Sequence, residues 1–266
     1  MRFTALKRCG VAKISGQHEN RIWGALMPIT SATSGQSRRT ILIVGASRGL
    51  GHAMAAEFVT KGWSVVGTVR GNSRTDLHDL ASQHDDRIEI EHLDINEPDQ
   101  IAALRGRLSG RTFDILFVNA GVTVRDQSTE IGQVSTEEFI QVMVTNALSP
   151  MRVVDALKDL VPAAGLIGIM SSGQGSIANN TRGMREVYRG SKAALNQYMR
   201  SFAARETEAN RAMVLMAPGW VRTDLGGGNA PLTIQDSIPN LVNVLLAKQG
   251  KPGLEYLDYL GRTVPW

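Results

Sequence analysis

The feature that most constrains the fold is an apolar stretch that leads directly into a glycine-rich turn. Thr40–Val44 (TILIV) is a continuous β-rich run, and Gly45, Gly49 and Gly51 follow it in the spacing GxxxGxG. Apolar residues then recur with helical spacing over Leu50–Lys61. Glycines allow a tight turn and close approach to a pyrophosphate, and free N–H groups at a helix start attract that group. The pattern predicts a strand–turn–helix that binds a nucleotide, although a glycine-rich turn without a ligand would look the same.

Apolar strands and helices alternate along the rest of the chain. Further strands are predicted at Ser64–Val69, Arg87–Leu93, Ile115–Val118, Gly165–Met170 and Met213–Met216. Further helices are predicted at Glu97–Leu108, Thr136–Leu160 (with a break near Pro150) and Tyr188–Glu206. Continuous apolar strands separated by helices are typical of a parallel sheet covered on both faces. We therefore expect an α/β protein, with one Rossmann-fold domain over residues 40–266 and helices on both faces of a doubly wound parallel sheet.

Residues 1–39 differ from the rest and are predicted to form a flexible N-terminal extension. They carry seven Lys or Arg and one Asp or Glu, whereas residues 40–266 carry 22 and 24. The basic balance therefore belongs to the extension, and we expect no nucleic-acid surface on the domain. Residues 1–26 have the composition of a transit peptide, but Met27 is an equally good start. A bacterial cytoplasmic protein with an over-extended start is the favoured interpretation, and a secretory signal is disfavoured because no continuous apolar core is present.

Composition also argues against several other classes of protein. The apolar runs are too short to span a bilayer, which needs about 20 residues, so no membrane association is expected. Cys9 is the single cysteine, so no internal disulfide can form. The five histidines lack the spacing of metal ligands, and no metal site is expected.

Two further motifs follow the predicted strands. Asn119-Ala120-Gly121 follows the fourth strand; alone, it is only a turn signal. Tyr188 and Lys192 form YxxxK near the start of a predicted helix, where residues four apart share one face. YxxxK is common by chance, and its position in this chain makes it informative.

Together these motifs resemble the short-chain dehydrogenase/reductase family over about residues 40–266. SSGQGSIANNT and the C-terminal GLEYLDYLGRTVPW resemble its C-factor-like and sniffer-like carbonyl reductase branch. Two departures are Val44, where many members have Thr, and the 16 positions from Ser172 to Tyr188, where many have 13.

The resemblance implies a set of catalytic residues. Tyr188 would be the acid in reduction and the base in oxidation, and Lys192 would lower its pKa and hold the nicotinamide ribose. Ser172, chosen over Ser171 and Ser176, would hold the substrate oxygen. Asn146 would help to hold a proton-relay water, although read alone it is a helix cap or a buried amide.

The resemblance also implies a dinucleotide cofactor. Val69 ends the second strand where NAD-binding folds usually place an acid, and Arg70 and Arg48 could bind a 2′-phosphate. We therefore expect NADP(H) rather than NAD(H), although two solvated arginines would give the same pattern. The expected cofactor-binding residues are Gly45, Ser47, Arg48, Gly49, Leu50, Gly51, Arg70, Asp94, Ile95, Asn119, Ala120, Gly121, Tyr188, Lys192, Pro218, Gly219, Val221 and Thr223.

The predicted function is that of an NADP-dependent oxidoreductase of class EC 1.1.1, a carbonyl reductase that moves a hydride between cofactor and substrate. The alternative is a non-catalytic NAD(P)-binding regulatory or signalling protein, and an epimerase or lyase is disfavoured because few residues follow Asp224. Gly173–Val187 and Leu225–Pro239 would line the substrate pocket, the latter as a mobile lid. The resemblance also implies a homodimer or homotetramer formed through the helices that carry Asn146 and Tyr188.

Overall fold

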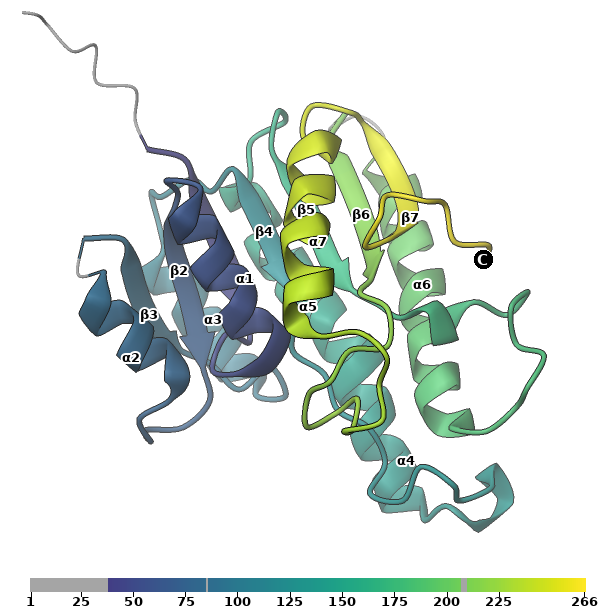
Figure 1. Ribbon diagram of the computed structural model, residues 1–266. Helices are drawn as coiled ribbons and strands as arrows, with labels where there is room; N and C mark the ends of the chain where they lie inside the picture. Colours follow the sequence, from purple (N-terminus) through teal and green to yellow (C-terminus); the bar gives the residue numbers. More distant parts are fainter. Residues whose placement is uncertain (1–37, 85, 207–209) are drawn as a thin grey trace, which may run out of the picture. The chain divides into compact units, whose positions relative to one another are not determined.

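The fold is built around one sheet of seven parallel strands (Figure 1). The computed structural model describes residues 38–84, 86–206 and 210–266, so the predicted extension lies outside the described residues, apart from Arg38 and Arg39. The strands are β1 (Thr40–Val44), β2 (Ser64–Val69), β3 (Ile88–His92), β4 (Ile115–Val118), β5 (Leu166–Met170), β6 (Ala212–Ala217) and β7 (Gly253–Asp258).

The strand order is β3-β2-β1-β4-β5-β6-β7, and every neighbouring pair is parallel. The chain moves outward from β1 to β3, returns to the centre at β4 and then moves outward on the other side. This reversal between β1 and β4 is the topological switch point of a doubly wound sheet. Ligands of such sheets bind beyond the carboxyl ends of the strands at this point.

Helices cover both faces of the sheet, as the sequence predicts. Leu77 of α2, Phe58 of α1 and Leu241 of α7 belong to the buried cluster on one face, and Leu104 of α3 and Leu195 of α6 belong to the cluster on the other. The helices are α1 (Gly49–Thr60), α2 (Asp76–Gln83), α3 (Pro98–Arg107), α4 (Thr136–Met143), α5 (Ser149–Leu157), α6 (Glu186–Arg205) and α7 (Ile234–Lys248), with short 3-10 turns at Ile131–Gln133, Lys158–Leu160 and Gly173–Gly175.

Three expectations need correction. The helix predicted over Thr136–Leu160 is interrupted before Pro150, by a π-helical segment at Val144–Leu148 that separates α4 from α5. The predicted lid, Leu225–Pro239, is a loop only as far as Thr233, because α7 begins at Ile234 and already buries Ser237 and Ile238. Three elements, α2, α7 and β7, were not predicted at all.

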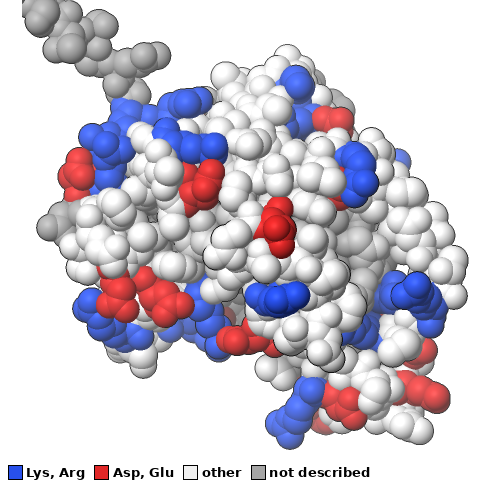
Figure 2. Space-filling view, viewed as in Figure 1, with Lys and Arg blue, Asp and Glu red and all other residues white. Residues whose placement is uncertain are grey.

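On the face drawn in Figure 2, Lys and Arg side chains are interspersed with Asp and Glu side chains. Among the described residues, no helix is both long enough and apolar enough to cross a membrane.

Candidate active site

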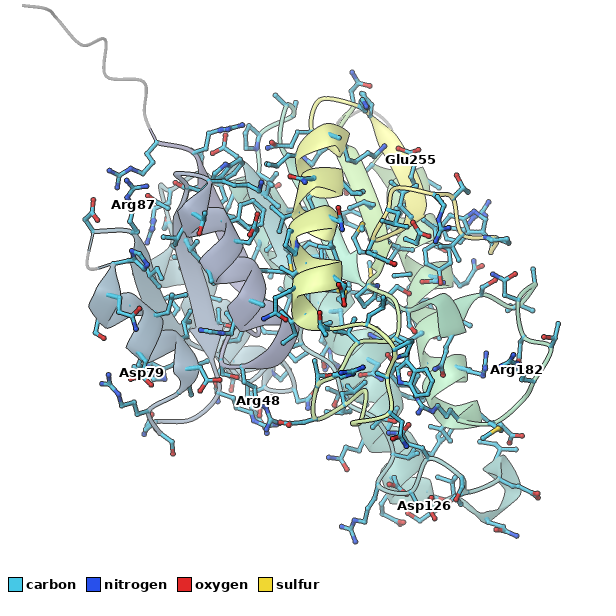
Figure 3. All side chains as sticks on the ribbon, viewed as in Figure 1. Arg48, Asp79, Arg87, Asp126, Arg182 and Glu255 are labelled. Carbon is cyan, nitrogen blue, oxygen red and sulfur yellow. The ribbon has the colours of Figure 1, made fainter. Side chains whose placement is uncertain are left out.

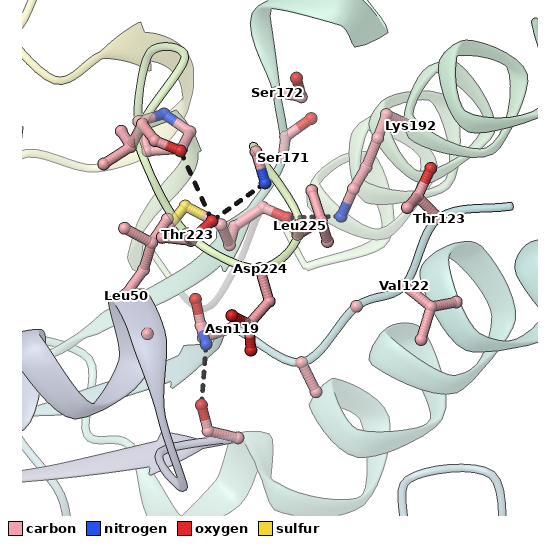
Figure 4. Close-up of a pocket in the computed structure, with 18 of the residues that line it drawn as sticks. Leu50, Asn119, Val122, Thr123, Ser171, Ser172, Lys192, Thr223, Asp224 and Leu225 are labelled. Atoms are coloured by element: carbon pink, nitrogen blue, oxygen red, sulfur yellow. Dashed lines mark hydrogen bonds between the residues drawn. The ribbon is translucent and has the colours of Figure 1, made fainter. Parts of the chain in front are cut away.

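A cleft of about 1400 Å³ lies at the switch point and is lined by the segments that follow the carboxyl ends of the strands. It brings together predicted residues from loops far apart in the sequence, and Figure 4 shows Asn119, Ser172 and Lys192 around it. Every predicted cofactor-binding residue lines the cleft except Gly51, and of the predicted catalytic residues only Asn146 does not.

The glycine loop packs directly against the segment after β4. Gly45 has a φ of +89°, and a Cβ there would lie 2.9 Å from Ala120. A Cβ on Gly51 would lie 2.0 Å from the carbonyl oxygen of Gly45. Asn119 Nδ2 donates a 2.7 Å hydrogen bond to that same oxygen (Figure 4). Gly51 therefore packs against the backbone of the loop itself, at a position where no side chain would fit. This packing explains why Gly51 does not line the cleft.

The start of α1 leaves backbone donors free at the cleft. No side chain caps the helix, whose N-cap is Arg48, and no acid lies in its first turn. Gly49 has a φ of +58°, and no atom lies within 4 Å of the position where its Cβ would be. The positive end of the helix dipole and an open approach to the backbone fit the pyrophosphate of a dinucleotide.

Three arginines line the cleft at the end near β1 and β2. Arg48 pairs with Asp224 at 2.9 Å, and both side chains are mainly exposed (Figure 3 labels Arg48). Arg74 pairs with Asp79 at 2.6 Å, and Arg70 makes no ion pair with any described residue. Sequence reasoning identified Arg48 and Arg70 but missed Arg74, which lies in the loop between β2 and α2 where spacing along the chain does not fix the geometry.

Helix α6 carries Tyr188 and Lys192 into the cleft on one buried face, as their spacing predicts. Lys192 is 4% exposed, and its Nζ lies 5.9 Å from the centre of the Tyr188 ring. Lys192 Nζ donates a 2.9 Å hydrogen bond to the carbonyl oxygen of Met170 at the end of β5. Burial without an acidic partner lowers the pKa of Lys192 to about 8.

The electrostatics of Tyr188 differ from the expectation. Burial is the largest effect and raises the pKa of Tyr188, whereas a hydrogen bond with Ser172 and the positive charge of Arg185 act to lower it. The family resemblance implies that Lys192 and the cationic ring of the oxidised cofactor together lower this pKa, and that role stays a prediction. In the structure the cation that opposes burial is Arg185, which sequence reasoning missed.

The three candidate serines after β5 have different surroundings. Ser171 donates a 2.6 Å hydrogen bond to Asn196, and Ser176 is buried and accepts from the backbone of Asn179. Ser172 is half-buried, lines the cleft and is the serine that interacts with Tyr188. Its geometry suits the predicted role better than that of the other two.

A residue of the unpredicted strand β7 holds Ser172 in place. The hydroxyl of Tyr256 donates a hydrogen bond to the carbonyl oxygen of Ser172. Tyr256 packs against Trp266, with ring centres 5.4 Å apart, and the carbonyl of Trp266 accepts from the backbone of Ala178. The C-terminal segment therefore helps to position the serine loop.

Asn146 lies in the π-helical segment and is fully buried. Its Oδ1 accepts from the backbone N–H of Val122 at 2.8 Å, and its Nδ2 donates to the Val122 carbonyl and to Ser191. A Cβ on Gly121 would lie 3.3 Å from Asn146 Oδ1. The side chain is thus a buried amide that joins the segment after β4 to α6, and its role in holding a water stays a prediction.

The loop after β6 closes the other end of the cleft. Pro218 accepts a hydrogen bond from Ser237 of α7, and Gly219 has a φ of +85°. Val221 forms an isolated bridge with Leu232, while Thr223 accepts from the backbone of Gly226. The loop is therefore held by α7 and by its own turns. No group of three or more His, Cys, Asp or Glu that could hold a metal occurs within the described residues.

Comparisons with known proteins agree with this geometry. A structure from Burkholderia multivorans, described as a short-chain dehydrogenase/reductase with bound NADP, is 67% identical with a TM-score of 0.85, over 86% of this chain and 100% of that one. The carbonyl reductase Sniffer of D. melanogaster is 30% identical with a TM-score of 0.79, over the same shares. C-signal of Myxococcus xanthus is 35% identical over 58% of this chain and 92% of its own length.

The relatives include proteins of the C-factor-like and sniffer-like branch that the C-terminal half of the sequence resembles. The family model for short chain dehydrogenases matches residues 39–231. The chain therefore belongs to the short-chain dehydrogenase/reductase family of oxidoreductases.

Proposed function

We propose that the protein is an NADP(H)-dependent oxidoreductase that interconverts a carbonyl compound and an alcohol, with Tyr188 as the acid and base. The proposal rests on one observation. Tyr188, Ser172 and Lys192 line the same cleft as the glycine loop. A protein that only binds a nucleotide needs no buried acid beside its site.

The preference for NADP(H) is supported by charge. Val69 occupies the end of β2, where an acid would accept a hydrogen bond from the ribose hydroxyl of NAD(H). Arg48, Arg70 and Arg74 line the cleft near this strand and would bind a 2′-phosphate through planar, bidentate donors. NADP in the Burkholderia multivorans structure adds support.

Each catalytic side chain has a defined task in this proposal. Bound NADP(H) would supply or accept the hydride. Tyr188 would donate its hydroxyl proton to the carbonyl oxygen in reduction, and burial raises its pKa and so keeps that proton in place near neutral pH. Ser172 would donate a hydrogen bond to the same oxygen. Lys192 would use ammonium donors beyond the one bound to Met170 to hold ribose hydroxyls.

The test compares Tyr188→Phe with Tyr198→Phe, which alters an exposed tyrosine on the same helix. With benzaldehyde as the probe carbonyl and NADPH as the donor, Tyr188→Phe should reduce turnover by about 10²- to 10⁴-fold, the usual contribution of an acid catalyst. Tyr198→Phe should match the wild type. Equal turnover in Tyr188→Phe and the wild type would refute the role of Tyr188.

The cofactor is tested by titrating the protein with NADPH and NADH and following nicotinamide fluorescence. Arg70→Ala should weaken NADPH binding about tenfold and leave NADH binding unchanged, because it removes one charge-assisted contact. Arg152→Ala, on the exposed side of α5, is the matched control. Tighter binding of NADH than NADPH by the wild type would contradict the assignment.

Similarity to a protein named C-signal favours a second candidate, the non-catalytic NAD(P)-binding regulator. The two candidates differ in one measurable respect. A regulator would bind NADPH but would show no turnover with any aldehyde or ketone of a broad panel, and Tyr188→Phe would change neither property.

A further inference from the structure

Arg185 lies at the end of the cleft beside Tyr188 and has no role in the chemistry described above. It lines the cleft, and its charge acts on the Tyr188 hydroxyl. Within the described residues its guanidinium forms no ion pair and donates no hydrogen bond. Its charge is therefore available to a ligand that also reaches Tyr188.

Trp220 supplies a flat surface at the same place. The Arg185 guanidinium carbon lies 5.8 Å from the centre of the Trp220 ring, and both residues line the cleft. Trp220 Nε1 donates a 2.7 Å hydrogen bond to the carbonyl of Gly226, which fixes the ring although it is 46% exposed. An exposed aromatic ring held in place beside a cation forms a wall suited to a planar group that bears a negative charge.

The backbone that presents Arg185 is unusual. Gly183, Met184 and Arg185 all have left-handed backbone conformations, with φ of 61°, 58° and 55°. Side chains other than glycine rarely adopt this region, and such unfavourable residues cluster at functional sites. Arg185 is also the N-cap of α6, three residues before Tyr188, so its position relative to the acid is set by the helix.

This cation is separate from those assigned to the cofactor phosphate. Arg70 follows β2 and Trp220 follows β6, and β1, β4 and β5 lie between these strands. Four strand spacings of about 4.8 Å place the two ends of the cleft roughly 19 Å apart. A phosphate bound at Arg70 therefore leaves Arg185 without a partner.

We propose that Arg185 is a specificity-determining residue that binds a carboxylate on the substrate, so that the preferred substrates are carbonyl compounds carrying an acid group on a flat apolar frame. The frame would lie against Trp220, and the carbonyl would point at Tyr188 and Ser172. The proposal depends on the proposed function for the position of the carbonyl, but the carboxylate contact can be measured without turnover.

The test is a calorimetric titration of the full-length protein saturated with NADPH. The probes are 4-(hydroxymethyl)benzoate and its neutral counterpart 4-(hydroxymethyl)benzamide, which are alcohols and do not react with NADPH. The wild type should bind the benzoate about 10- to 100-fold more tightly, as expected for a charge-assisted bidentate contact. Equal affinity for the two probes, or no detectable binding of the benzoate, would overturn the proposal.

Two variants locate the contact. Arg185→Asn removes the charge and suits a left-handed position, so it should bring the ratio of the two affinities close to one and leave binding of the benzamide unchanged. Arg182→Asn, on the loop before α6 and outside the cleft (Figure 3), should keep the wild-type ratio. If Arg185→Asn does not fold, the ratio in the wild type and in Arg182→Asn still decides whether a carboxylate is preferred.

Turnover separates this inference from the proposed function. Reduction of benzaldehyde without any preference between 4-carboxybenzaldehyde and 4-carbamoylbenzaldehyde would retain the function and refute the role of Arg185. If the protein binds the benzoate preferentially but turns over no aldehyde, the proposed carboxylate contact at Arg185 stands and the proposed carbonyl reductase activity is refuted.

Discussion

Replacing Lys192 with Met should make the cofactor-free protein more stable at neutral pH while it abolishes activity. Lys192 is 4% exposed, and burial lowers its pKa from 10.5 to about 8. Each pKa unit corresponds to about 1.36 kcal/mol, so holding the ammonium in this site costs roughly 3 kcal/mol at pH 7. Met has a similar volume and carries no charge, so it removes this cost.

The gain is partly offset by the hydrogen bond that the substitution removes. Lys192 Nζ donates to the carbonyl of Met170, and the loss of a donor to a buried carbonyl costs about 1 kcal/mol. The free energy of unfolding of Lys192→Met should therefore exceed that of the wild type by about 2 kcal/mol at pH 7.

The difference must also depend on pH with a defined sign. The unfolded lysine titrates near its ordinary value of 10.5 and the folded one near 8, so the unfolded state binds more protons between these values. The wild type therefore gains stability as pH rises from about 8 to about 10.5, and the cost of burying Lys192 falls to about 1 kcal/mol by pH 10, which the hydrogen bond to Met170 offsets. The two proteins should then be nearly equal in stability.

Urea denaturation between pH 7 and pH 10 measures this difference. Lys251→Met, at an exposed lysine, is the matched control and should stay within about 0.5 kcal/mol of the wild type throughout. A less stable Lys192→Met at pH 7, or a difference that does not change with pH, would refute the reasoning.

Three further predictions concern the frame of the cleft. Gly51→Ala should lower the free energy of unfolding by about 3 kcal/mol and abolish NADPH binding, because the added Cβ would lie 2.0 Å from the carbonyl oxygen of Gly45; unchanged urea denaturation would contradict this. Asn146→Ala should lower it by about 3 kcal/mol, because buried backbone groups after β4 lose their partners; a thermal midpoint equal to that of the wild type would exclude the bracing role. Asp224→Asn should change stability by less than about 0.5 kcal/mol, because its ion pair with Arg48 is exposed, and should tighten NADPH binding up to about fivefold by releasing the arginine; weaker binding in a fluorescence titration would count against this.

The central strands could be predicted closely because they are buried on both faces. β1, β2 and β4 have the bounds that the apolar runs indicate. The missed helix α2 is only eight residues long and its apolar face consists of Leu77, Leu80 and Ala81, which is too short a stretch for helical periodicity to identify it. α7 contains Pro239, which the sequence analysis interpreted as the end of a loop. Thr233 and Asp236 form a capping box at its start, a signal that was present in the sequence and was not used.

The site could be predicted where spacing along one helix or one turn fixes the geometry. Tyr188 and Lys192 share a face because they lie four residues apart, and this needs no tertiary information. The effect of Arg185 on the acid could not be predicted, because it depends on a left-handed backbone and on a tryptophan from the loop after β6. Likewise, the spacing in the sequence does not reveal that Asn146 lies in a π-helical segment and is fully bonded.

Several residues whose burial or backbone conformation is intrinsically unfavourable lie near the carboxyl edge of the sheet. A lysine is buried without an acid, two non-glycine residues in succession are left-handed, and a helix is interrupted by a π-helical turn. The central strands follow their apolar runs, but conflicts of this kind also occur at the amino end of β6, where Asn210 is left-handed and Arg211 is buried with unpaired donors. If stability alone had shaped this edge, Lys192 would be apolar and Arg185 would be glycine. Under the functions proposed above, both side chains lie where they would reach a bound ligand, and the stability gained by Lys192→Met would measure what this arrangement costs the fold.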